Sequence, residues 1–142
     1  MYEEIAAILH PLPAPGSIEP EDIYNDVCGE IDKDRQDAVH ALEIAWDVEE
    51  AEPLLRSITL ARRRKEEAEE EIRLLLAYGR EFTRPRPYTL AELAAAAGMS
   101  VSGVRTAYDH AQVAGVAEAI GRPGRDWRAT DPGDSPDSPD TP

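Results

Sequence analysis

The stretch LAELAAAAGMSVSGVRTAY, residues 90–108, decides the fold that we expect for this chain of 142 residues. Apolar residues recur at helical spacing on both sides of Gly98, which can adopt the positive φ angle that a tight turn between helices requires. Ala94 is small enough to let two helix backbones cross closely. The stretch therefore predicts two short helices joined by a turn, the second beginning at about Val101.

Local signals support both helices. Thr89 can cap the first helix, and Glu92 three residues later completes a capping box. The positions that we expect to be buried carry aliphatic or small residues, namely Leu90, Leu93, Ala97, Met99, Val104 and Ala107. Such a pair of helices buries one apolar side and leaves the other side to solvent.

This pattern resembles the bacterial helix-turn-helix class, which includes sigma-factor region-4-like and repressor domains. The resemblance covers about 20 residues of the motif and some 50 with its flanking helices. It implies that the second helix lies in the major groove of double-stranded DNA, with its amino-terminal half against the base edges. Ser100, Ser102, Arg105 and Thr106 would then contact bases or phosphates, whereas Gly103 would contribute little. The alternative for Arg105 is a solvated surface charge.

Basic residues flank the motif on both sides. We expect their guanidinium groups to hold DNA phosphates. They are Arg84, Arg86, Arg122, Arg125 and Arg128. The last three form a basic arm around Trp127, whose expected role is to anchor the end of the chain by packing.

Residues 113–130 have two possible structures. Asp109 and Gln112 can cap a short helix whose apolar residues share one face. Alternatively, residues 116–120 could pair with residues 127–130 as a β-hairpin wing. We favour the helix.

The amino-terminal part predicts an acidic helical module over residues 1–52. Three helices are expected in it: one over 2–10 with Ile5, Ile8 and Leu9 on one face, a short second helix carrying Ile23, Val27 and Ile31, and a third from Lys33 to near Glu52. Pro53 then starts a new helix, although a single kinked helix is an alternative.

A long connecting helix is predicted over residues 53–82. Nine positions alternate four and three apart and form a heptad seam, which is apolar or small except at Lys65 and is weak in its middle, at Lys65 and Ala68. They are Leu54, Ile58, Ala61, Lys65, Ala68, Ile72, Leu75, Gly79 and Phe82. Two interpretations stay open, a solvated helix and a short coiled coil that forms a homodimer through residues 54–82.

Charge is segregated within a total formal net charge of −14. Residues 1–57 carry 15 acidic and 3 basic side chains, a net charge of −12, whereas residues 83–130 carry 4 and 6, a net charge of +2. The motif thus lies in the only positive segment, a DNA-binding unit over 83–130, and the acidic tail over 131–142 is expected to be disordered. Because +2 gives weak DNA binding to a monomer, we expect a dimer, and for residues 1–52 a basic protein partner.

The composition indicates an all-α protein, because Ala, Leu, Glu and Arg dominate and aromatic residues make up 6% of the chain. No apolar stretch is long enough to cross a bilayer and no leader pattern opens the chain, so we expect a cytoplasmic protein without membrane contact. Thirteen Arg against two Lys favours a bacterial, GC-rich origin.

Catalytic and metal-binding patterns are missing from the sequence. His10, His40 and His110 lack metal-ligand spacing, and Cys28 lacks the basic surroundings that activate a thiol. We therefore expect no metal, no cofactor and no enzymatic activity. The leading hypothesis is sequence-specific DNA binding in transcriptional or mobile-element regulation. The alternative is a protein-interaction adaptor or DNA-mimicking acidic module that keeps the helix-turn-helix fold as a scaffold.

Overall fold

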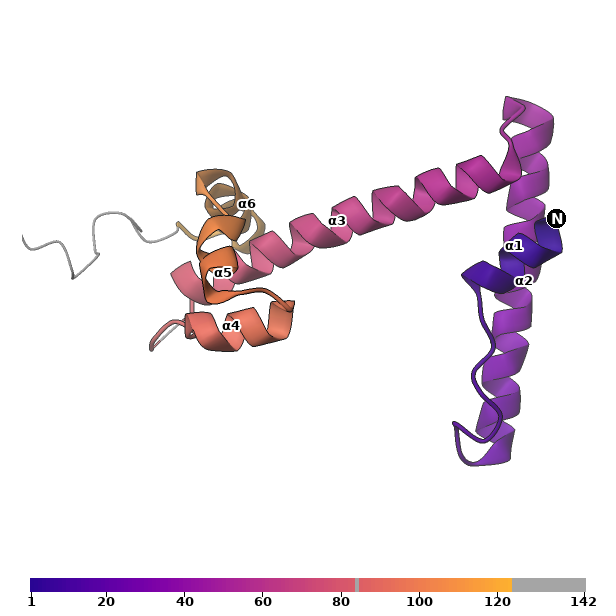
Figure 1. Ribbon diagram of the computed structural model, residues 1–142, viewed down its shortest axis with the longest axis horizontal. Coiled ribbons are helices and arrows are strands. Elements are labelled where there is room, and N and C mark those ends of the chain that lie inside the picture. The colour runs from indigo at the N-terminus through magenta and orange to yellow at the C-terminus, as the bar shows by residue number, and fades with distance from the viewer. Residues whose placement is uncertain (84, 124–142) are drawn as a thin grey trace, which may run out of the picture. The chain divides into compact units, whose positions relative to one another are not determined.

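The computed structural model describes residues 1–83 and 85–123, which are helical throughout their regular structure and contain no strand (Figure 1). The helices are α1 (Tyr2–Leu9), α2 (Glu21–Glu49), α3 (Pro53–Glu81), α4 (Leu90–Ala97), α5 (Val101–Ala107) and α6 (His110–Ile120). The all-α class expected from the composition is confirmed.

The chain divides into two compact units, Met1–Lys65 (unit 1) and Glu66–Pro142 (unit 2), and the boundary falls inside α3. The sequence pattern separates residues 53–82 as a connecting element of their own. In the structure, the first turns of α3 belong to unit 1 and its last turns supply the core of unit 2.

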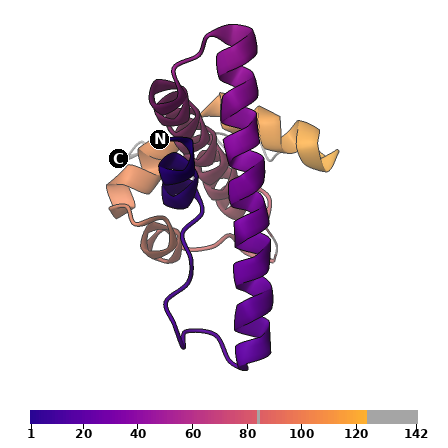
Figure 2. The same ribbon diagram turned by 90° about the vertical axis from the view of Figure 1, so that its right-hand side faces the viewer.

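Helix α2 of unit 1 is one uninterrupted helix of 29 residues (Figure 2). The expected break near Lys33 is wrong, because no proline and no left-handed residue separates the two apolar patterns. The helix ends where Glu50 adopts a left-handed conformation with φ 51°. The Glu50 amide donates to the Trp46 carbonyl, and the Ala51 amide donates to the Ala45 carbonyl. The new helix expected at Pro53 is confirmed.

The core of unit 1 is small. Helix α1 contacts α2, and the buried apolar side chains of these two helices are Ile5, Ala6, Leu42 and Ala45. Pro53 at the start of α3 is buried as well. The expected apolar face of α1 is therefore wrong in part, since Ile8 is 77% exposed. The small Ala6 side chain lets α1 approach α2 closely. Ile8 lies on the opposite side of α1 from Ala6. The Arg35 Nε atom holds the end of α1 by donating to the His10 carbonyl at 2.8 Å.

The core of unit 2 lies on two sides of the last turns of α3. On one side, Leu76 packs with Ala94 of α4 and Val104 of α5. On the other side, Ala77 and Phe82 pack with the buried valines of α6. Tyr108, in the link between α5 and α6, contacts both clusters.

This packing takes up the second half of the expected heptad seam. Phe82 and Gly79 are buried and Ile72 packs against the α4–α5 cluster, so these positions face the chain's own helices. A Cβ atom on Gly79 would lie 3.1 Å from Leu93 Cδ2, which shows how closely α4 approaches α3. Leu75 is the member of this half of the seam that stays exposed, at 59%, so a continuous coiled coil through residues 72–82 is excluded.

Helix α6 settles the structure of residues 110–120. Asp109 and Gln112 form the expected capping box, and Gly121 ends the helix with φ 64°. The favoured helix is confirmed, and the strand of the wing alternative over 116–120 is excluded. The partner strand of that alternative, Trp127 and the acidic tail lie outside the described residues. None of the helices described here is both long and apolar enough to cross a membrane.

Replacing Val104 should measure how much the α3–α4–α5 contact contributes to stability. Val104 is fully buried, so Val104→Ala leaves a cavity between three helices and should lower the free energy of unfolding by about 2 kcal/mol. The matched control is Val101→Ala on the same helix, because Val101 is 40% exposed, and it should cost less than about 0.5 kcal/mol. Urea unfolding of the full chain measures both, and equal losses would contradict the described packing.

Candidate nucleic-acid interface

Helices α4 and α5 are joined by a turn with the geometry that the motif requires. Gly98 has φ 63°, its amide donates to the Ala94 carbonyl, and the Met99 amide donates to the same oxygen at 3.0 Å. Ala94 is buried at the expected crossing point. This arrangement is compatible with a helix-turn-helix unit, with α5 in the position of the second helix.

The start of α4 is fixed by the expected capping box. The Glu92 amide donates to Thr89 Oγ1 at 3.2 Å, and the Thr89 amide donates to Glu92 Oε2 at 2.8 Å. The Thr89 hydroxyl also donates to this carboxylate, and together these bonds lower the pKa of Glu92.

The start of α5 is capped by Ser100. Its Oγ atom accepts from the Gly103 amide at 3.0 Å and lies 3.2 Å from Ser102 Oγ. A Cβ atom on Gly103 would lie 3.1 Å from Ser100 Oγ. Gly103 therefore makes room for the cap, a role that the sequence pattern did not indicate. Ser100 combines this role with its position at the predicted interface.

The exposed side of α5 carries the predicted base-reading residues. Ser102, Arg105 and Thr106 are exposed. The Thr106 hydroxyl lies within hydrogen-bond distance of the Ser102 carbonyl at 3.2 Å and the Gly103 carbonyl at 3.3 Å, so its proton is engaged within the helix. The Arg105 guanidinium has no hydrogen-bond or ion-pair partner among the residues that the structure describes. Arg105 is thus the side chain of α5 best placed to meet a ligand.

One position expected to be buried is not. Met99 is 40% exposed, because it lies in the turn after the left-handed Gly98, outside both helices. The prediction that Met99 belongs to the core is wrong. The exposed Met99 and Val101 side chains border the start of α5 with apolar surface.

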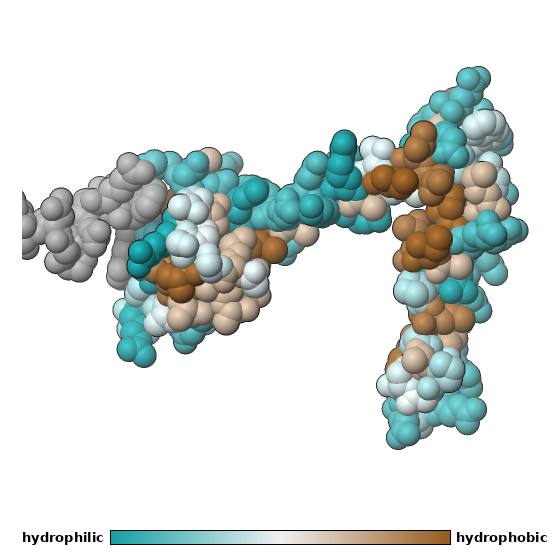
Figure 3. All heavy atoms as spheres, in the orientation of Figure 1, coloured by the Kyte–Doolittle hydropathy of each residue, from teal (hydrophilic) through white to brown (hydrophobic). Residues whose placement is uncertain are grey.

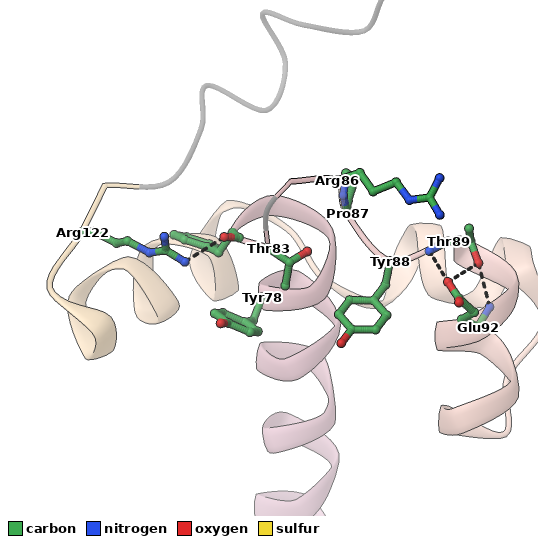
Figure 4. A pocket seen from close by; sticks show the side chains of 9 residues that line it. Tyr78, Thr83, Arg86, Pro87, Tyr88, Thr89, Glu92 and Arg122 are labelled. Atoms are coloured by element: carbon green, nitrogen blue, oxygen red, sulfur yellow. Dashed lines mark hydrogen bonds between the residues drawn. The ribbon is translucent and has the colours of Figure 1, made fainter.

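Two of the five flanking arginines line one pocket next to the start of α4 (Figure 4). Arg122 donates through Nη2 to the Phe82 carbonyl at 2.7 Å, and its guanidinium lies 5.9 Å from the centre of the Phe82 ring. Arg86 extends on the opposite side of the pocket toward Thr89 and Glu92. Arg84, Arg125 and Arg128 lie outside the described residues.

The rings of Tyr78 and Tyr88 line the same pocket between these two arginines (Figure 4). The sequence pattern did not single them out, because Tyr78 belongs to α3 and only its packing brings it to this place. The Tyr88 backbone is held by two bonds to the end of α3, one from its amide to the Gly79 carbonyl and one to its carbonyl from Arg80. These two bonds attach the carboxyl end of the loop that carries Arg86 to the last turns of α3.

A polar network fixes the link between α5 and α6 to α3. The Tyr108 hydroxyl donates to Glu81 Oε1 at 2.7 Å, and Gln112 Nε2 donates to Glu70 Oε1 at 3.1 Å. Gln112 and then Arg73 lower the pKa of Glu70. Partial burial, followed by the hydrogen bond to Glu81, raises the pKa of Tyr108 well above its usual value. These contacts orient α5 with respect to the rest of unit 2.

Comparisons with protein families, with curated proteins and with solved structures found no match to this chain. Within residues 1–83 and 85–123, no three His, Cys, Asp or Glu side chains come together as a metal site.

Tyr108→Phe should reduce the alkaline sensitivity of the fold. Because the pKa of Tyr108 is higher in the folded than in the unfolded chain, stability is complete below the unfolded value of about 10 and falls as the pH rises above it. The variant should lose about 1 kcal/mol at neutral pH through the missing bond to Glu81 and then decline less steeply above pH 10. Urea unfolding from pH 8 to 11 measures both effects.

The matched control for this experiment is Tyr88→Phe, since the Tyr88 ring is exposed. This variant should keep both the stability of the parent chain at neutral pH and its steep alkaline decline. Parallel declines of the parent chain and Tyr108→Phe would contradict the coupling of the Tyr108 hydroxyl to folding.

Proposed function

We propose that this protein binds double-stranded DNA sequence-specifically through α5 and acts in transcriptional or mobile-element regulation. The observation that carries the proposal is the position of Arg105, exposed on α5 and without an intrachain partner among the described residues. A guanidinium at this place can form a forked pair of hydrogen bonds with the O6 and N7 atoms of guanine. Ser102, one turn earlier on the same helix, is exposed beside it.

The surroundings of α5 support phosphate contacts on one side. Arg86 and Arg122 line the pocket at the start of α4, and the attachment of this loop to α3 gives Arg86 a defined place. Phosphate contacts position a protein on the duplex, whereas base contacts give the specificity. The Arg122 guanidinium keeps further donors after its bond to Phe82, because a guanidinium carries five N–H groups.

Charge limits how strongly one chain can bind. Residues 89–108 contain one acidic and one basic side chain, Glu92 and Arg105, so the two helices of the motif add no net positive charge. Non-specific affinity depends on the number of neutralised phosphates. We therefore expect functional binding to need two chains on paired half-sites.

The test begins with selection of bound sequences from random DNA by the full chain. On the selected sequence at low salt, Arg105→Ala should weaken binding roughly 10- to 100-fold and relax the preference at one base pair. Arg86→Ala should weaken binding to all sequences alike and reduce the slope of log affinity against log salt by about 0.9. Fluorescence anisotropy with labelled duplexes across a salt series measures both effects.

The matched control is Arg64→Ala, which removes the same charge from an exposed position of unit 1. It should leave the sequence preference unchanged. Absence of DNA binding at low salt, or equal effects of Arg105→Ala and Arg64→Ala, would refute the proposal.

The charge of unit 1 favours a second candidate function, a protein-interaction adaptor whose acidic residues bind a basic protein. Unit 1 carries a net charge of −8, which is unsuited to a surface that faces DNA. Under this function, the selection would enrich no sequence, and affinity for any duplex would equal that for a scrambled control.

A further inference from the structure

Unit 1 exposes more large apolar side chains than it buries. Hydrophobic side chains gather on it over α1 and the first turns of α3 (Figure 3). We call the unit 1 apolar surface the exposed aliphatic side chains of α1, the end of α2 and the start of α3: Ile8, Ile44, Val48, Leu54, Leu55 and Ile58. Their exposed fractions range from 48% to 77%.

We propose that a second copy of this chain covers the unit 1 apolar surface, so that the protein is a homodimer through unit 1. The end of α2 and the start of α3 adjoin through residues 50–52, which brings most of these side chains to one end of the unit. The sequence pattern predicts a dimer interface along residues 54–82, and this inference restricts the part of α3 in that interface to its first two turns. It does not depend on DNA binding.

The size of the core is the first argument. Only four apolar side chains of helices α1 and α2 are buried in unit 1, and two of them are alanines. A domain of about 60 residues buries roughly 60% of its unfolded surface and is marginally stable even then. A partner that covers the exposed apolar side chains would therefore stabilise unit 1. A second copy is the one partner that is always present at equal concentration.

The available area is the second argument. A standard interface buries about 800 Å² on each partner, of which roughly 60% is apolar, or about 500 Å². Full burial of an aliphatic side chain removes on the order of 60–120 Å² from water, so six half-exposed side chains supply roughly 200–450 Å². The upper end of this range approaches the apolar area of a standard interface.

The second half of the heptad seam, residues 72–82 of α3, cannot supply a continuous dimer interface. Gly79 and Phe82 are buried within unit 2, and Ile72 packs against its core. Leu75 is 59% exposed in that half but has buried or packed seam positions on both sides of it. Three exposed aliphatic side chains lie close together in the first two turns of α3, at Leu54, Leu55 and Ile58. The interface that the structure leaves open thus belongs to unit 1.

The charge of unit 1 predicts how salt should change the affinity of the proposed dimer. Unit 1 carries 15 acidic and 7 basic side chains, a net charge of −8, so two copies repel each other at low salt. Salt screens this repulsion and should strengthen the dimer. A basic protein partner on the same surface would instead be attracted to it and released by salt.

The experiment measures the mass of the full chain by sedimentation equilibrium at about 50 and 300 mM salt. We expect twice the chain mass of 15.6 kDa, with a lower dissociation constant at the higher salt. Leu55→Glu combined with Ile58→Glu places two charges in the interface and should raise the dissociation constant about 100-fold or more. The control with the same added charge is Asn25→Glu combined with Gln36→Glu, two exposed positions of α2 outside the apolar surface, which should leave the dimer intact.

A second measurement needs no variant. Hydrogen exchange of the unsubstituted chain, above and below the dissociation constant, should show that α1 and the first turns of α3 lose protection on dilution while α4 to α6 keep theirs. A monomer at every salt concentration, or a dimer that the double substitution leaves intact, would overturn the proposal. A monomer that binds a cationic amphipathic peptide through Leu55 and Ile58 would assign the surface to a basic partner instead.

The proposed DNA binding and the proposed dimer can each be refuted without the other. The double variant should still bind a single half-site at low salt, because Leu55 and Ile58 lie in unit 1 and α5 lies in unit 2. A dimer without DNA binding would refute the proposed function and leave this inference standing.

Discussion

The burial of Val104 between α3 and α4 is the contact on which unit 2 depends. Val104 is fully buried and packs with Leu76 and Ala94, so a single side chain of α5 holds three helices together. Its place on the helix also sets the direction of its neighbour. When Val104 points into the core, Arg105, about 100° further around the helix, projects into solvent. The packing constraint and the proposed DNA contact are therefore two consequences of one helix orientation.

Polar contacts hold this orientation where apolar packing ends. The Tyr108 hydroxyl donates to Glu81, and Gln112 donates to Glu70, so the link after α5 is attached to α3 at two points. At the other end, Ser100 caps α5 and Gly103 leaves room for the cap. Such support matters for sequence reading, because a base contact requires the side chain at a defined distance from the groove.

Unit 1 differs from unit 2 in how much of its apolar surface is buried within the chain. Unit 2 buries side chains from four helices, whereas unit 1 leaves Ile8, Val48 and Leu55 largely exposed beside a core of four small or aliphatic residues. An acidic unit with this surface pairs with a second copy in our proposal. In this proposal, unit 1 forms the dimer and unit 2 contacts DNA. Two paired chains double the number of phosphate contacts and so compensate for the low positive charge of each motif.

Local patterns in the sequence by themselves determined the all-α class, the capping boxes at Thr89 and Asp109, the turn at Gly98 and the helix start at Pro53. Each depends on side chain and backbone groups within four residues of one another, so the chain carries the information locally. Tertiary structure alone decided that α2 runs unbroken, that Met99 is exposed and Ile8 unpartnered, and that the second half of the heptad seam faces its own unit. It also brought Tyr78 and Tyr88 to the pocket beside Arg86. An apolar residue at helical spacing has several possible partners, and only the competition among all helices for the same buried surface selects one of them.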